Sequence, residues 1–176
     1  MTRVLRRLAD GGEIFQVKER FGRSLITALA RLGGHVVGFV ANQPIQKGGA
    51  CDADGCDKAV SFLALCDSFN IPLVLLHDVP GFFIGRDAER KRVAGKIITW
   101  MDALGMVTVP RVSIIVRKTY GQWELDTLPY GAAAWHLIDE VIDPADTRDV
   151  VIRFLAQART RCAISRHRLA GWPTKF

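Results

Sequence analysis

The chain has 176 residues, of which 49% are apolar, and a formal net charge of +6. This length suffices for one domain with a buried core, and the apolar content excludes a disordered chain. No apolar run approaches the ~20 residues of a membrane-spanning helix, and no hydrophobic signal-peptide core follows the basic N-terminus, so we expect a cytoplasmic protein with no membrane partner.

The distribution of basic residues and cysteines argues against two further classes of function, nucleic-acid binding and metal binding. Arginines and lysines gather in three separate clusters, at residues 3–7, 86–96 and 159–168, and no nucleic-acid motif is present, so we expect no nucleic-acid partner. A basic surface also suits an anionic ligand such as a phosphorylated cofactor. Cys51 and Cys56 are five residues apart and no CxxC occurs, so we expect reduced thiols and no metal.

Hydrophobic periodicity predicts alternating helices and strands. In chain order, we expect a helix at 2–11, a strand at 35–42, a helix at 54–70, a strand at 71–77, a helix at 86–105, a strand at 111–117 and a final helix at 146–161. Asp52 or Asp54 is suited to cap the second helix, and Gly105 to end the third. Residues 21–34 have no predicted element, and residues 138–144 predict a short strand and turn. The alternation indicates a parallel sheet with helices outside.

Two of these strands end in glycine-bearing turns, and the turns are the candidate site. The strand at 71–77 runs into His77-Asp78-Val79-Pro80-Gly81-Phe82-Phe83-Ile84-Gly85, and the strand at 111–117 runs into Arg117-Lys118-Thr119-Tyr120-Gly121. Folds of the α/β class bind ligands at the carboxyl ends of such strands. We therefore expect both turns to face one site.

Each candidate residue also has a simpler structural interpretation. For Gly81 and Gly85 the alternative to lining a ligand is loop geometry alone, and for Gly121 it is a simple turn. Asn42 and Gln43 end the first strand, where they either bind a ligand or only cap the strand.

For the other polar residues near the turns we expect ordinary structural roles. His77 is expected to be a satisfied core residue rather than a catalyst, and Asp78 to cap the next turn. The run at 86–92 is interpreted as a solvated helix start, with contact to a phosphate or a partner as the alternative. The chain has no GxSxG, Walker loop or HExxH, so hydrolase, NTPase and zincin functions lack support.

Several collinear segments, spread over most of the chain, carry a family resemblance. They are Arg31-Leu32-Gly33-Gly34, Val40-Ala41-Asn42-Gln43-Pro44, Asp57-Lys58-Ala59, Cys66-Asp67-Ser68-Phe69-Asn70-Ile71-Pro72-Leu73, Asp78-Val79-Pro80-Gly81-Phe82, Thr108-Val109-Pro110, Arg117-Lys118-Thr119-Tyr120-Gly121, Ile138 to Arg148, and Trp172-Pro173-Thr174-Lys175-Phe176. Together they resemble the C-terminal half of the carboxyltransferase (β) subunit of biotin-dependent acyl-CoA carboxylases, such as propionyl-CoA carboxylase.

The resemblance implies a fold, a reaction and a set of site residues. The fold is α/β and ClpP/crotonase-like, built from repeated ββα units with a mostly parallel sheet, and residues 1–176 form one C-terminal carboxyltransferase domain. The reaction moves a carboxyl group from carboxybiotin to the α-carbon of an acyl-CoA, with two oxyanion holes and no side-chain nucleophile. The implied backbone oxyanion donors are Gly121 and Gln122, and the implied substrate-binding residues are Asn42, Gln43, Pro80, Gly81, Phe82, Gly85 and Tyr120.

The same resemblance implies partners. The cofactor is biotin, carried on a separate carrier domain, and the substrate is an acyl-CoA of the acetyl or propionyl type. The family buries its active site between the N-terminal half of one subunit and the C-terminal half of another. We therefore expect a homo-oligomer or an N-terminal carboxyltransferase half as a partner, together with a biotin carboxylase or biotin carrier subunit.

Three departures from the family pattern bear on activity. Relatives continue the turn after Gly121 with a second glycine and a small residue, whereas this chain has Gln122 and Trp123. Relatives have several tens of residues between that turn and the segment at Ile138, and here only about sixteen intervene. The N-terminal half of the family, which carries much of the CoA site, is absent. Two hypotheses follow, a C-terminal carboxyltransferase domain or subunit, and a truncated non-catalytic paralogue with a structural or subunit-interaction role.

Overall fold

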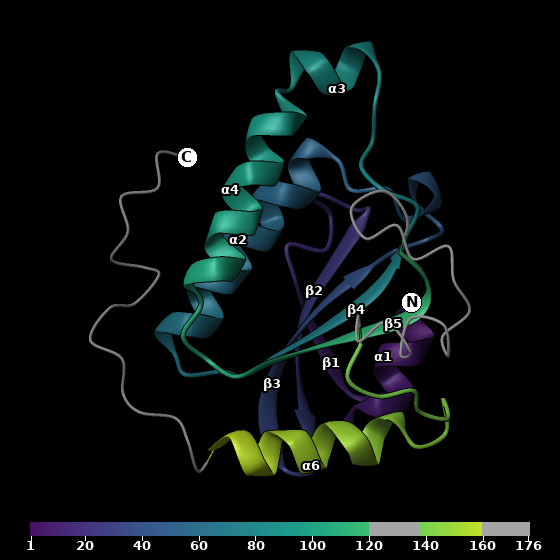
Figure 1. Cartoon of the computed structure of the whole chain (residues 1–176), viewed down its shortest axis with the longest axis vertical. Helices are drawn as coiled ribbons and strands as arrows, with labels where there is room; N and C mark the ends of the chain where they lie inside the picture. Colours follow the sequence, from purple (N-terminus) through teal and green to yellow (C-terminus); the bar gives the residue numbers. More distant parts are fainter. Residues whose placement is uncertain (120–137, 160–176) are drawn as a thin grey trace.

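The computed structural model describes residues 1–119 and 138–159, which form one mixed sheet covered by helices on both faces (Figure 1). The strands are β1 Ile14–Val17, β2 Leu25–Leu32, β3 His35–Asn42, β4 Leu73–Val79 and β5 Arg111–Thr119, in that spatial order. The helices are α1 Thr2–Leu8, α2 Ala53–Ser68, α3 Arg86–Arg90, α4 Val93–Met106 and α6 Thr147–Arg159, with 3₁₀ turns η1 Asp10–Gly12 and η2 Lys47–Gly49.

The sheet combines a parallel half with an antiparallel half. β3, β4 and β5 are parallel neighbours, which confirms the three strands predicted from apolar runs. β1 and β2 are antiparallel additions that the sequence analysis missed, so the sheet is mixed rather than mostly parallel. β2 is buried along most of its length on both faces, so it lacks the alternation that identifies a half-exposed strand. The succession β2–β3–α2 is one ββα unit.

A tight glycine turn makes the β2–β3 hairpin. Gly33 and Gly34 have φ of 59° and 80°, the left-handed conformation that a two-residue hairpin turn of type I′ requires. The Asp10 carboxylate accepts hydrogen bonds from both amides, at 3.0 and 2.7 Å. The guanidinium of Arg148 on α6 also donates to Asp10, at 2.7 Å. The hairpin is therefore tied to both ends of the described chain.

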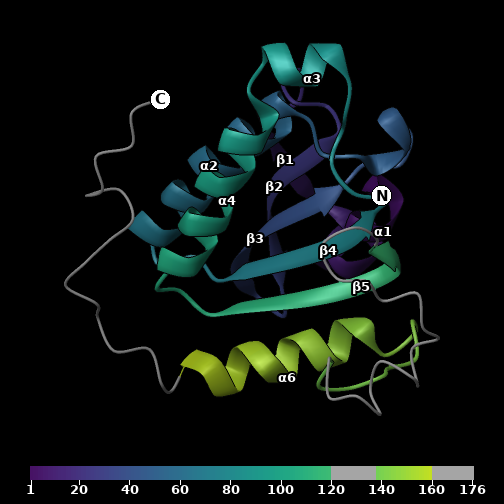
Figure 2. The same ribbon diagram turned by 45° about the horizontal axis from the view of Figure 1, so that its top comes forward.

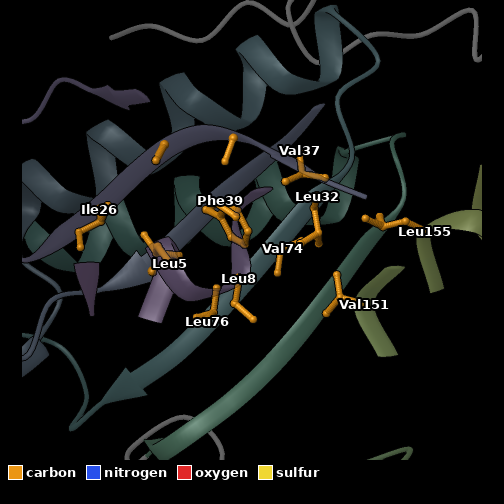
Figure 3. Close-up of a cluster of buried hydrophobic side chains, with 14 residues drawn as sticks. Leu5, Leu8, Ile26, Leu32, Val37, Phe39, Val74, Leu76, Val151 and Leu155 are labelled. Atoms are coloured by element: carbon orange, nitrogen blue, oxygen red, sulfur yellow. The ribbon is translucent and has the colours of Figure 1, made fainter. Parts of the chain in front are cut away.

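Helices cover the two faces of the sheet separately. α2 and α4 pack on one face, while α1 and α6 lie on the other (Figure 2). Figure 3 shows the second of these cores, to which α1 contributes Leu5 and Leu8, α6 contributes Val151 and Leu155, and β3 contributes Phe39. The helices of these two layers pack against the faces of the sheet. The carboxyl ends of β3, β4 and β5 are followed directly by loops.

Four sequence-based predictions need correction. The helix expected at 86–105 is broken at Arg92, whose φ of 53° is left-handed, and its second part ends at Met106 rather than at Gly105. Residues 138–143 form no strand, although a turn precedes α6. β5 was expected to be a buried strand, but it lies last in the described sheet, and Ile115 and Val116 are 42% and 43% exposed.

The predicted cap of α2 is confirmed. Asp52 caps α2, since its carboxylate accepts a 2.9 Å hydrogen bond from the amide of Gly55. Among the helices of the described ranges, none is both long and apolar enough to cross a bilayer.

Candidate functional site

The carboxyl ends of β3 and β4 bring two loops together, and these loops form the strand-end site. The first, at 43–52, connects β3 to α2 through η2, and the second, at 80–85, connects β4 to α3. Because β3, β4 and β5 are parallel, their carboxyl ends share one edge of the sheet. The sequence predicts that the turns after β4 and β5 face one site, and this stays a prediction because the turn after β5 continues beyond the described residues. The structure instead joins the loop after β4 to the loop after β3. Tyr120, Gly121 and Gln122 lie outside the described residues, so their predicted roles stay predictions.

A short backbone bridge joins the two loops. The amide of Cys51 donates to the carbonyl of Gly81 at 3.1 Å, and the amide of Phe83 donates to the carbonyl of Cys51 at 2.9 Å. Gly81 and Gly85 have φ of 126° and 119°, which side chains rarely adopt. Glycine at these two positions is therefore required by the loop geometry itself, whether or not the loop also lines a ligand.

The predicted substrate-binding residues differ in their accessibility. Pro80 and Gly85 are exposed, and Gly81 and Phe82 are half-buried beside the first loop. Asn42 is 3% exposed, so its side chain lies beneath the loops rather than on their surface. The structure thus brings the described ones to one end of the sheet, and Asn42 among them is not accessible at the surface.

Gln43 points away from the second loop, toward α1. Its amide nitrogen donates to the hydroxyl of Thr2 at 3.3 Å, and its oxygen accepts from the amino group of Met1 at 3.2 Å. An open pocket of about 450 Å³ lies here, lined by Gln43 together with Met1, Thr2, Arg3, Arg6 and Ile45. Gln43 therefore lines a hollow beside α1, and the lining of this hollow includes neither Pro80 nor Gly85.

An ion pair links β4 to β5 where their pairing becomes irregular. The register runs from His77 opposite Ile115 to Val79 opposite Thr119, so β5 has extra residues at this point. Arg117 lies in this bulge and donates two hydrogen bonds to the buried carboxylate of Asp78, at 3.2 and 3.1 Å. Bulges commonly re-aim a strand next to a functional site. The sequence analysis gave Asp78 only a capping role and missed Arg117 as its partner.

Lys47 connects the two loops on their exposed side, and the sequence analysis also missed it. Its ammonium lies 2.5 Å from the Asp52 carboxylate and 4.6 Å from the centre of the Phe83 ring. Burial acts to raise the pKa of Asp52, but hydrogen bonds from Lys47, the amide of Gly55 and the hydroxyl of Ser24 outweigh it and hold that pKa below its usual value. The Asp52 carboxylate is thus ionised and keeps Lys47 over the loops.

Burial keeps two titratable side chains near the site uncharged. His77 is half-buried, and burial lowers its pKa, so the ring is neutral at physiological pH. Burial raises the pKa of the Cys51 thiol to about 12, despite the hydrogen bond that it accepts from Asn42. Within residues 1–119 and 138–159, no group of His, Cys, Asp and Glu is arranged to hold a metal ion.

Lys58 lies beneath the strand-end site and is 2% exposed. Its ammonium donates a 2.8 Å hydrogen bond to the carbonyl of Leu25, which is opposite Asn42 in the β2–β3 register. Burial lowers the pKa of Lys58 to about 8, with a raising contribution from Glu19 and a further lowering one from Lys18.

This pKa predicts a pH dependence of stability. The pKa of Lys58 is about 8 in the folded chain and 10.5 ordinarily, so the unfolded state binds more protons between these values. The contribution of Lys58 to the free energy of unfolding should therefore rise by about 2 to 3 kcal/mol between pH 8 and pH 10.5 and stay constant below pH 8.

The measurement compares urea unfolding of the wild type with that of Lys58→Met across this pH range. The comparison is needed because burial raises the pKa of Cys51, Cys56 and Cys66 to about 12, which lowers stability as the pH rises. Both proteins contain these thiols, so they cancel in the difference. The wild type should gain stability relative to Lys58→Met as the pH rises, and a pH-independent difference would contradict the buried, depressed ammonium.

Comparisons with known proteins identify the family. The carboxyl transferase domain family matches residues 1–123. The uncharacterised carboxylase YngE of Bacillus subtilis is 44% identical over 121 residues, and the propionyl-CoA carboxylase beta chain of Roseobacter denitrificans is 42% identical over 121 residues. Each alignment covers 69% of this chain and 24% of the relative, so the chain spans about a quarter of the length of these curated relatives.

Solved structures give the same result. The crystal structure of transcarboxylase 12S with methylmalonyl-coenzyme A bound is 31% identical, with a TM-score of 0.87 over 94% of this chain and 42% of that chain. The beta subunit of Pseudomonas aeruginosa geranyl-CoA carboxylase, at 20% identity and a TM-score of 0.76 over 90% of this chain and 42% of that chain, shows the shared fold alone. The α/β, crotonase-like fold class is thereby confirmed. The chain belongs to the carboxyl transferase domain family.

Proposed function

We propose that the chain supplies the C-terminal carboxyltransferase part of a biotin-dependent acyl-CoA carboxylase, acting on an acetyl- or propionyl-type acyl-CoA. The observation that carries the proposal is the strand-end site, in which the loops after β3 and β4 are joined through Cys51 in a chain of this family. Related proteins support the substrate class, since they include a propionyl-CoA carboxylase beta chain and a methylmalonyl-CoA carboxyltransferase 12S subunit.

The second loop is apolar and leaves space beside Gly85. Gly85 faces open space, since an added Cβ would meet no atom within 4 Å, and Phe82, Phe83 and Ile84 flank it. When bound, the biotin group on its carrier would supply the carboxyl group. The loop at 80–85 would hold the rings, and the backbone of Gly121 and Gln122 would provide the oxyanion donors, as expected from the sequence.

Exposed apolar side chains on both strand-end loops suit contact with a partner protein. Ile84 and Ile45, at 86% and 83% exposed, are the most exposed large apolar side chains of the described residues, and each belongs to one of the two strand-end loops. Such side chains fit a surface that a further protein layer covers. We propose that this layer is an N-terminal carboxyltransferase half, within a homo-oligomer that also meets a biotin carboxylase or biotin carrier subunit. Transcarboxylase 12S itself forms a hexamer.

The test is carboxyl transfer from carboxybiotin to propionyl-CoA, by the chain alone and with the N-terminal half of a related carboxylase beta chain. Loss of one oxyanion donor costs about 10²- to 10³-fold in rate. We therefore expect the chain alone to stay near background and the mixture to exceed it by at least about 10²-fold. The alternative, a non-catalytic paralogue, predicts that the two halves co-elute on gel filtration without turnover. Robust turnover by the chain alone would refute the need for a partner.

A further inference from the structure

The buried side chain of Asn42 joins three segments of the strand-end site. Its amide nitrogen donates to the carbonyl of Gly49 at 3.2 Å and to the sulfur of Cys51 at 3.3 Å. Its oxygen accepts from the amide of Asp78 at 3.3 Å. Both N–H groups and the oxygen of the amide are therefore engaged within the protein.

The residues that Asn42 contacts are themselves bonded to the second loop and to β5. Gly49 and Cys51 belong to the first loop, and the backbone of Cys51 carries both hydrogen bonds to the second loop, through Gly81 and Phe83. Asp78 ends β4, and its carboxylate holds Arg117 in the β5 bulge. One amide thus touches both the loop bridge and the residue that anchors β5.

Asn42 is suited to this position because an amide both donates and accepts. The first loop presents acceptors, a carbonyl and a sulfur, while the end of β4 presents an N–H donor. A carboxylate would lose the donors and an aliphatic side chain would lose every bond, leaving the buried amide of Asp78 unpaired. With 3% of its surface exposed, Asn42 offers no atom to a substrate.

We propose that Asn42 is a positioning residue that holds the two strand-end loops and the end of β4 in register, rather than a residue that contacts the substrate. This role replaces the substrate contact expected from the sequence, and its catalytic consequence rests on the proposed function. Loss of the Asn42 hydrogen bonds frees Cys51 first, and with it the bridge to the second loop.

Cys51 reports on this positioning without any need for activity. Cys51, Cys56 and Cys66 are each 2% exposed or less, so all three should resist iodoacetamide in the wild-type chain. Only Cys51 accepts a hydrogen bond from Asn42. Release of the first loop should therefore expose one thiol selectively, whereas general unfolding exposes all three.

The experiment measures the alkylation rates of Cys51, Cys56 and Cys66, each on its own peptide, by tandem mass spectrometry in the full-length wild type, Asn42→Ala and Asn42→Leu. We expect Cys51 to react about tenfold faster or more in both variants, with Cys66 unchanged. The leucine variant keeps the branching of asparagine at Cγ without its polar atoms and leaves no cavity, so it separates lost hydrogen bonds from a cavity, and either variant suffices if the other fails to fold. Gln43→Ala is the matched control, because Gln43 bonds to Met1 and Thr2, and Cys51 should stay protected.

A second arm uses carboxyl transfer with the N-terminal half present. Asn42→Ala should lower kcat about 10- to 100-fold with little change in KM for the acyl-CoA, because misplaced loops affect the reacting geometry. A raised KM with unchanged kcat would show substrate contact and overturn the proposal. So would a protected Cys51, or equal exposure of all three cysteines. If the wild type is inactive, the proposed function fails while the cysteine arm still decides the role of Asn42.

Discussion

Replacing Val74 with aspartate is expected to leave no soluble, folded protein. Val74 is fully buried in β4, between β3 and β5, and belongs to the core shown in Figure 3. An unpaired carboxylate at such a position costs several kcal/mol, which is comparable with the total stability of about 5–15 kcal/mol of a typical domain. Soluble yield and thermal unfolding followed by circular dichroism measure the effect.

Ile114→Asp is the matched variant on β5. Ile114 is opposite Leu76 in the parallel register and packs against the same core, but it is only half-buried because β5 is the last strand of the described sheet. Its carboxylate keeps contact with water, so Ile114→Asp should stay folded with a lowered melting temperature. A wild-type melting temperature for Val74→Asp would show that β4 is not a buried central strand, and equal losses for both would contradict the exposed position of β5.

The sequence predicted the parallel half of the sheet because that half has strong local signals. The run that became β4 is continuously apolar, the run that became β5 is apolar and β-branched, and α2 has helical spacing with an acidic cap. β2 has neither signal, since it is buried on both faces and rich in Leu and Ala, which favour helices. All eight residues of β2 pair with the eight residues of β3. The strand conformation of β2 therefore depends on this pairing and not on a local sequence signal.

The candidate site, like the sheet, has one part that local sequence patterns predict and one part that depends on tertiary packing. The strand-end position of the second loop was predictable, because Gly81 and Gly85 follow an apolar run. The hydrogen bonds of Asn42 and the ion pair of Arg117 were not, since Asp78 is 36 residues from the first and 39 from the second. Local patterns specify that a polar side chain ends a strand, but only the packed sheet determines which segments it joins.

Gly49→Ala is expected to be the most damaging single substitution within the first loop. Gly49 has a left-handed φ of 91°, and an added Cβ would lie 2.5 Å from the carbonyl oxygen of Asp78. Left-handed strain and a backbone clash add up to about 3 kcal/mol, or a melting temperature about 6–12 °C lower for a chain of this size. Differential scanning calorimetry measures the shift.

Gly48→Ala separates the left-handed strain from the backbone clash as causes of the lost stability. Gly48 is also left-handed, at a φ of 65°, but an added Cβ would meet no atom within 4 Å. It should therefore show the strain alone, about 1 kcal/mol and a melting temperature about 2–4 °C lower. If both variants lose the same stability, the close approach of the first loop to β4 is not what requires glycine at Gly49. If Gly49→Ala alone is severely destabilised, the contact between this loop and the carbonyl of Asp78 is as close as the structure places it, and the register that Asn42 sets there admits no added atom.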